Sequence, residues 1–280
     1  KRIEPERVRE RDVIVPATLP MELDPTLFLT HLSQLQQLTE PEGGIGTCLE
    51  RLNAKHQRFA ELLAPEAAPL DLQRVEELLE KVFTARRRIY PLLQAFGQEQ
   101  TAAAVKAVLS GEGPVEERMR AFAEAMPVAP GEDRESRRLA AKQRRAAMDF
   151  AAELLHFRDP VKYPLMTRWV WDKSTMSGAL RELVRGADEL RELPFDMSPE
   201  TFEGARKWLA EQIAGQGIYR DVPFWIDLLL GNAYVGYVRS MAEGNLGGDF
   251  GRGVSPLEQL KKLLGIDEPL QGRSRAKKPT

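Results

Sequence analysis

Apolar residues recur along most of this chain at steps of three and four positions, the spacing of one face of an α-helix. The pattern is clearest after Asp24-Pro25, where "LFLTHLSQLQQL" follows a capping carboxylate and a proline at the first helical position. The predicted helices span residues 24–40, 48–63, 72–97, 99–109, 114–126, 134–157, 165–189 with a break near 174–178, 198–215, 222–243 and 256–265. We therefore predict an all-α fold of about ten helices, in one large lobe or two loosely divided lobes.

Proline and glycine suggest how the chain is organised. Residues 1–23 are charged and then β-branched, with prolines that disfavour helix, so this segment should be an extended arm. It either docks on its own domain or wraps a partner. The loop "PVAPGED" separates an N-terminal helical lobe, 24–126, from a C-terminal lobe, 134–265. Residues 266–280 form a basic tail that we expect to be disordered.

Composition excludes several classes of protein. Hydrophobic residues make up 42% and charged residues 29% of the chain, an ordinary globular balance, and the formal net charge of −2 excludes a strongly basic protein. Cys48 is the one cysteine, so intrachain disulfides and four-cysteine zinc sites are excluded, and a reducing, cytoplasmic location is expected. No apolar run approaches 18 residues, so we expect neither a membrane span nor a secretory signal.

A cluster of candidate metal ligands lies on the helix over 134–157. Asp149, Glu153 and His156 are spaced i, i+4 and i+7, which places them on one face, and Glu153 begins a Glu-x-x-His unit like those of two-metal helix bundles. The second such unit is missing from the chain. A single metal ion at Glu153 and His156, completed by Asp149 or Asp172, is one hypothesis. The alternative is that His156 hydrogen-bonds the following loop, and we predict no cofactor.

The same helix begins with a basic strip. Arg134, Arg138, Lys142 and Arg145 follow at steps of four, four and three residues and could bind phosphates. Such strips are more often solvated or partner-facing surfaces, because acidic residues are close by. The run "ARRR" at 85–88 and the basic tail add to the case for nucleic acid, and Arg252, in a glycine-rich loop, could help to bind an anion.

The segment "LLHFRDPVKYPLMTRWVWDK", 154–173, is rich in aromatic and charged residues. Pro160 should end one helix, and Tyr163-Pro164 should begin the next. On a helix, Trp169 and Trp171 would point to different sides, so one could enter the core while the other faces a groove or partner. We therefore name a candidate partner-binding set. Its members are Tyr163, Arg168, Trp169, Trp171 and Lys173.

Known catalytic motifs fail on context. The sequence "DFG" at 249–251 has no accompanying kinase catalytic loop, and the glycines around it match neither a P-loop nor a dinucleotide fingerprint. Because no catalytic constellation is complete, the leading hypothesis is a non-catalytic accessory or assembly protein that binds another protein. The alternatives are a nucleic-acid-associated protein using the basic strip and a metal- or cofactor-dependent helical enzyme using Glu153 and His156. A homo-oligomer is compatible with all three hypotheses.

Overall fold

The all-α prediction is confirmed by the computed structural model, which describes residues 13–64, 70–128, 131, 133–244 and 253–267. Within these residues the chain forms ten α-helices and no β-strand. The expected basic tail from residue 268 on and Arg252 lie outside the described residues. The α-helices are α1 (Pro25–Thr39), α2 (Ile45–Leu62), α3 (Leu72–Glu80), α4 (Arg86–Phe96), α5 (Gln98–Ser110), α6 (Val115–Ala125), α7 (Arg134–Arg158), α8 (Pro199–Gly215), α9 (Val222–Gly244) and α10 (Pro256–Leu264). Three short 3-10 segments are η2 (Glu40–Glu42), η3 (Ala179–Leu183) and η4 (Ala187–Glu189).

Side-chain caps set many of the helix starts. As the sequence predicts, Asp24 accepts the backbone N–H of Thr26 at the start of α1, and Asp71 caps α3 in the same way. Asp133 and Ser198 cap α7 and α8, and Ser255 forms a capping box at α10. These oxygens accept N–H groups that have no partner within the helix, so each helix begins where its cap stands.

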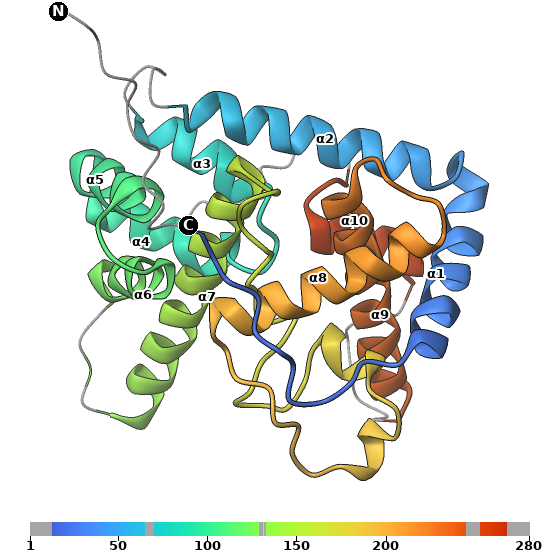
Figure 1. Cartoon of the computed structure of the whole chain (residues 1–280). Coiled ribbons are helices and arrows are strands. Elements are labelled where there is room, and N and C mark those ends of the chain that lie inside the picture. The colour runs from blue at the N-terminus through green and yellow to red at the C-terminus, as the bar shows by residue number, and fades with distance from the viewer. Residues whose placement is uncertain (1–12, 65–69, 129–130, 132, 245–252, 268–280) are drawn as a thin grey trace, which may run out of the picture.

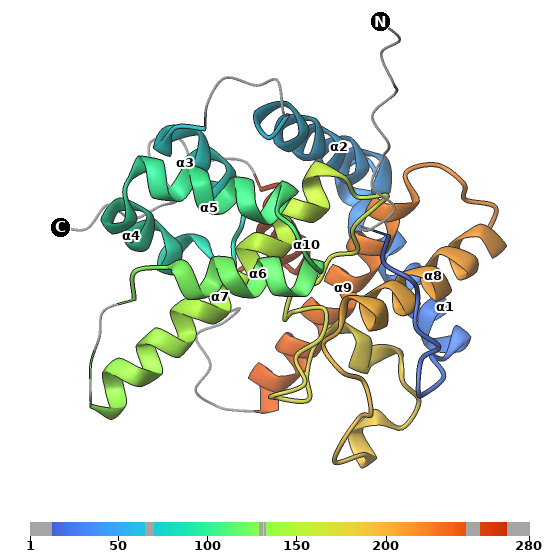
Figure 2. The same cartoon turned by 60° about the vertical axis from the view of Figure 1, so that its left-hand side comes forward.

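The helices gather around α7, which runs through the middle of the molecule (Figure 1). Helices α3 to α6 lie on one side, while α1, α8, α9 and α10 lie on the other. The C-terminal half of α7 is buried and packs against α2, α4, α5 and α6, whereas its N-terminal half extends beyond the neighbouring helices (Figure 2). The buried apolar residues of the segments 24–126 and 134–265 belong to one continuous cluster.

The predicted single helix over 72–97 is wrong, because the chain forms α3 and α4 with a turn between them. Val82 and Ala85 are fully buried in this turn, which is closed by hydrogen bonds from the N–H groups of Lys81 and Val82 to the end of α3. Pro91 lies inside α4 and does not mark the break. Burial of the two apolar side chains therefore decides where the break falls.

The predicted helix over 165–189 is also wrong. Among residues 160–198, which are all described, the chain forms turns and the segments η3 and η4. Asp172 accepts the N–H of Ser174 at 2.9 Å, and its own N–H donates to Ser177 O at 2.8 Å, so the chain doubles back. Gly178 makes this path possible, since its φ is +127° and a Cβ there would lie 2.6 Å from a backbone oxygen. Local polar side chains thus compete successfully with the helix.

The described part of the N-terminal arm, residues 13–23, docks on its own domain. The N–H of Ala17 donates to Glu200 O at 2.9 Å at the start of α8, and Leu19 and Met21 pack against the core. The backbone of the arm lies very close to Gly204 of α8, where an added Cβ would lie 2.3 Å from Ala17 O. The absence of a side chain at residue 204 is therefore a condition for this docking.

We predict that Gly204→Ala displaces the arm and lowers the free energy of unfolding by about 1–3 kcal/mol, the usual cost of overpacking. Urea unfolding measures the loss. The matched control is Gly236→Ala in α9, where the added Cβ meets nothing within 4 Å and helix propensity alone should give a small gain. Equal stability of the two variants would contradict the tight docking of the arm.

Candidate functional site

The three candidate metal ligands of α7 do share one buried face, as their spacing predicts. Asp149, Glu153 and His156 are each at most 2% exposed. Their side chains, however, pair with three different parts of the chain rather than with one another. We call this set of three buried pairs the polar ladder of α7. Burying so many charges is costly unless each is paired and hydrogen-bonded, which is the arrangement seen here.

The middle pair of the polar ladder joins α7 to α2. Lys55 Nζ lies 2.8 Å from Glu153 Oε2, and both side chains are 2% exposed. The same Nζ donates to Leu264 O at the end of α10 at 2.8 Å and lies 3.7 Å from the centre of the Phe157 ring. Burial lowers the pKa of Lys55 and raises the pKa of Glu153, while their mutual attraction opposes both shifts.

The pair nearest the surface joins α7 to the loop that follows it. Asp149 accepts the backbone N–H of Arg168 at 3.0 Å and its guanidinium at 2.7 Å. Burial raises the pKa of Asp149, and the charge and hydrogen bonds of Arg168 oppose the rise. The Arg168 side chain is 30% exposed and also lies 4.0 Å from Asp172. Arg168 therefore connects the buried polar ladder with the surface.

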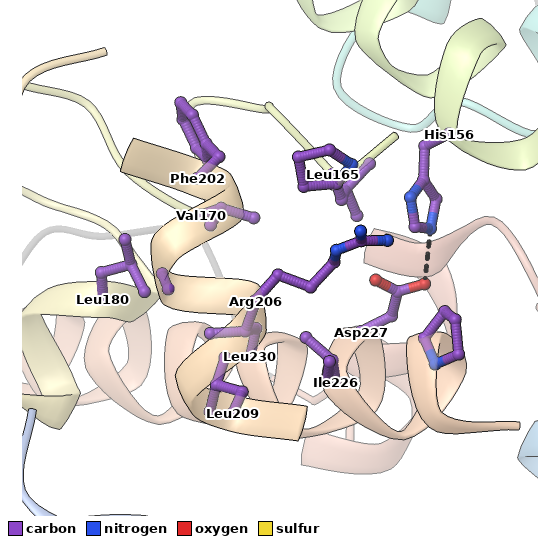
Figure 3. Close-up of a pocket in the computed structure, with 13 residues that line it drawn as sticks. His156, Leu165, Val170, Leu180, Phe202, Arg206, Leu209, Ile226, Asp227 and Leu230 are labelled. Atoms are coloured by element: carbon purple, nitrogen blue, oxygen red, sulfur yellow. Dashed lines mark hydrogen bonds and ion pairs between the residues drawn. The ribbon is translucent and has the colours of Figure 1, made fainter. Parts of the chain in front are cut away.

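The third pair joins α7 to α9. His156 Nδ1 lies 2.8 Å from Tyr163 O, so the ring donates there, and Nε2 lies 2.8 Å from Asp227 Oδ2 (Figure 3). The predicted hydrogen bond from His156 to the following loop is thus present. Each of the two ring nitrogens therefore faces an oxygen atom, one of a backbone carbonyl and one of a carboxylate. The pair borders a cavity of about 20 Å³ with walls that include Leu165 and Ile226, which has room for one water molecule.

These contacts bear on the metal hypothesis. Among the described residues, no group of three or more His, Cys, Asp or Glu side chains is arranged to hold a metal ion. Glu153 and His156 face Lys55 and Asp227 instead. A single metal ion at Glu153 and His156 stays a prediction, which elemental analysis of protein purified without chelators tests.

The aromatic members of the candidate partner-binding set lie in the core. Trp171 is fully buried and packs edge-on against Phe195, and Trp169 and Tyr163 are each 3% exposed. The expectation that one tryptophan faces outward is therefore wrong, because these residues are not in a helix and their two-residue spacing does not separate them. Arg168 and Lys173 keep exposed surface, so partner binding through them stays a prediction.

The basic strip lies on the part of α7 that extends from the molecule (Figure 2). Arg134, Arg138 and Arg145 are exposed and Lys142 is half-buried. None of the four forms an ion pair with a described residue. The nearby carboxylate of Asp133 accepts the N–H groups of the first helical turn. The positive charge of the strip is therefore largely uncompensated.

A second positive surface appears only in the folded chain. A groove of about 810 Å³ lies where the start of α4, the middle of α9 and α10 come together. Its described lining contains no carboxylate and has five cationic side chains, namely Arg86, Arg87, Arg88, Arg168 and Lys262. The rings of Phe83 and Tyr234 also form part of its walls. We call this the cationic groove.

The five cations of the groove differ in how they are held. Arg87 and Arg88 are exposed and Lys262 is half-buried, and none of the three has an ion-pair partner among the described side chains. Arg86 is 9% exposed, with its guanidinium 5.0 Å from the centre of the Phe83 ring. Arg168 is fixed by Asp149. The groove thus combines three cations that have no ion-pair partner among the described side chains with two guanidinium groups held by neighbouring residues.

Helical geometry places the basic strip and the cationic groove next to each other. Arg145 precedes Asp149 by four residues, which is about 6 Å along the helix axis and on the same face. Asp149 in turn holds Arg168, which lines the groove. The Arg145 end of the strip is therefore connected to the groove through Asp149 and Arg168.

Only part of this site was visible in the sequence. The run at 85–88 was recognised as basic, but nothing local linked it to Lys262 or Tyr234, which lie more than 140 positions further along the chain. The docking of α10 and α9 beside α4 brings them together. Phe83 falls inside the single helix that the sequence predicts over 72–97. The break between α3 and α4 is what places its side chain at the groove.

We predict that Lys55→Met lowers the free energy of unfolding by about 3–5 kcal/mol, because it leaves the buried Glu153 carboxylate without its partner. The double variant Lys55→Met/Glu153→Leu should regain most of this loss in urea unfolding. Removing Glu116 from its exposed pair with Arg120 is the control and should change little. If the double variant is as unstable as the single one, Lys55 does not stabilise the fold by compensating the charge of Glu153.

The same variant should also respond to pH. In Lys55→Met, the pKa of folded Glu153 should lie well above its ordinary value of 4.5. The folded state then binds a proton that the unfolded state does not, so the stability lost by the substitution should be partly regained as the pH falls toward 4.5. Urea unfolding across this range measures the effect, which Glu153→Leu added to the same background should abolish.

Comparison with known proteins gives no information on the fold family or the function of this chain. Searches against family models, curated proteins and solved structures return no match. Of the helices in the described part of the chain, including the apolar α9, none has the length and hydrophobicity to cross a membrane. The functional argument therefore rests on the geometry of the side chains.

Proposed function

We propose that this protein binds nucleic acid through its phosphate backbone, using the cationic groove and the basic strip of α7. One observation carries the proposal: a groove of about 810 Å³ whose described lining has five cationic side chains and no carboxylate. Guanidinium groups bind phosphate oxygens through two parallel hydrogen bonds, and releasing counterions from the phosphates supplies much of the affinity. The net charge of −2 is compatible with this, because the positive charge is local.

The geometry gives less support to the leading protein-binding hypothesis. That hypothesis rested on the absence of a complete catalytic constellation, on the extended arm and on the tryptophan pair flanked by charged residues. The described part of the arm is docked on α8, and Trp169 and Trp171 are in the core. Binding to another protein stays a prediction. The nucleic-acid hypothesis gains support from the fold, because the basic run Arg86–Arg88 lines one groove together with Arg168 and Lys262.

Charge reversal in the groove tests the proposal. We expect Arg87→Glu/Arg88→Glu to weaken binding of a labelled 20-nucleotide DNA at least tenfold and to lower the slope of log K against log salt by about 2, one for each lost phosphate contact. Fluorescence anisotropy between 50 and 200 mM salt measures both quantities (roughly the range over which such binding is steep). The control with the same change in charge is Arg191→Glu/Arg220→Glu, two exposed positions outside the groove. An equal loss of DNA affinity in both variants would show that only the net charge of the protein matters, and not the position of the two arginines.

A separate reversal tests the strip. Arg138→Glu/Lys142→Glu should also weaken binding and reduce the salt slope, because these side chains are free to contact phosphates. Circular dichroism and urea unfolding should match the unmodified protein, since this half of α7 packs on little. If binding is unchanged, the strip is not part of the nucleic-acid surface, and the groove alone carries the proposal.

A further inference from the structure

We infer that the cationic groove receives unpaired nucleotides, so that the protein prefers single-stranded nucleic acid over duplex. This inference rests on the proposed function and specifies the class of ligand. Phosphate contacts alone give no preference for a single strand, because a duplex carries more backbone charge per unit length than one strand does. The distinction comes from the walls of the groove, where aromatic and aliphatic side chains lie beside the cations.

The Tyr234 ring is the best-supported surface for a base. It belongs to α9, lines the groove and is half-buried. The Trp169 ring lies behind it at a centroid distance of 6.0 Å, and the Tyr237 ring lies at 6.3 Å with an interplanar angle of 35°. Because Trp169 is itself buried in the core, Tyr234 is held in place before any ligand binds. A ring fixed in this way loses little entropy when a base stacks on it.

A second flat surface comes from the turn between α3 and α4. Phe83 lines the groove there, and the Arg86 guanidinium lies 5.0 Å from the centre of its ring. Bases stack on aromatic rings and on arginine planes alike. The three free cations, Arg87, Arg88 and Lys262, are close enough to line the same groove and suit the phosphates between successive bases. The groove thus matches the alternating chemistry of a single strand, with apolar bases and charged linkers.

The dimensions of the groove argue against a duplex. About 810 Å³ falls within the usual range of 300–1,000 Å³ for sites that enclose a small ligand, enough for a few nucleotide units at most. The major groove of B-DNA is about 12 Å wide, and the whole duplex is wider still. A duplex therefore cannot be enclosed in a site of this volume. In a duplex the bases are also paired and stacked, so they cannot reach Tyr234 or Phe83 unless the strands separate.

The basic strip provides an internal contrast. Residues 134–145 include no aromatic side chain, so the strip offers charge without a stacking surface. Charge alone gives the strip no means of favouring a single strand over a duplex. Any preference for single strands must therefore come from the groove, and substitutions of its aromatic residues should remove that preference while leaving the charge-dependent part of binding in place.

The experiment compares oligo(dT) of 20 nucleotides with a 20-base-pair duplex by fluorescence anisotropy at one salt concentration. The full chain should bind oligo(dT) more tightly. Phe83→Leu and Tyr234→Leu should each weaken oligo(dT) binding by about 5- to 100-fold, the usual effect of removing one stacking contact, and leave duplex binding and the salt slope unchanged. Tyr234→Phe keeps the ring and should retain the affinity. Tyr219→Leu, which removes an aromatic that is 75% exposed, is the matched control.

The outcomes separate this inference from the proposed function. Equal or tighter binding of the duplex overturns the inference, as does full oligo(dT) affinity in both leucine variants. If Arg87→Glu/Arg88→Glu still abolishes binding in that case, the proposed function stands without the single-strand preference. If neither nucleic acid binds in a salt-dependent way, the proposed function itself fails. Inorganic polyphosphate, which has no bases, should bind with equal affinity to the unmodified protein and to Phe83→Leu.

Discussion

The buried ion pair between Lys55 and Glu153 is the interaction on which the arrangement of this protein depends. It joins α2 to α7, and the additional bond from Lys55 Nζ to Leu264 O fixes the end of α10 at the same point. A lysine and a glutamate this far from water are tolerable only together, because either charge alone would be desolvated without compensation. The pair therefore favours the one arrangement in which these three helices meet.

The other two pairs of the polar ladder extend this constraint along α7. His156 and Asp227 set the position of α9, and Asp149 holds Arg168. Because α4, α9 and α10 form the cationic groove, the pairs that position α9 and α10 also determine its shape. Arg168 belongs to both the ladder and the groove. The buried polar residues of α7, which the sequence presents as candidate metal ligands, thus also position the helices that form this surface.

Positive and negative side chains are placed differently in this structure. The chain is slightly acidic overall, yet it carries clusters of positive charge on the N-terminal half of α7 and around the start of α4. Many acidic side chains elsewhere are engaged in local bonds, as Asp133 is at a helix cap and Asp149 in the core. A positive surface on a protein of near-neutral charge gives local attraction for polyanions without the non-specific binding of a strongly basic protein.

The sequence by itself determined the helical class, the caps at Asp24 and Asp71, and the face shared by Asp149, Glu153 and His156, because all of these depend on residues within a few positions of one another. Tertiary structure decided the rest. The break between α3 and α4 depends on the burial of Val82 and Ala85, and in the turns of 160–198 the hydrogen bonds of Asp172 and the close approach at Gly178 override the helical pattern. The members of the cationic groove are up to 180 positions apart, from Phe83 to Leu263, and only the docking of whole helices brings them, and the partners of the polar ladder, together.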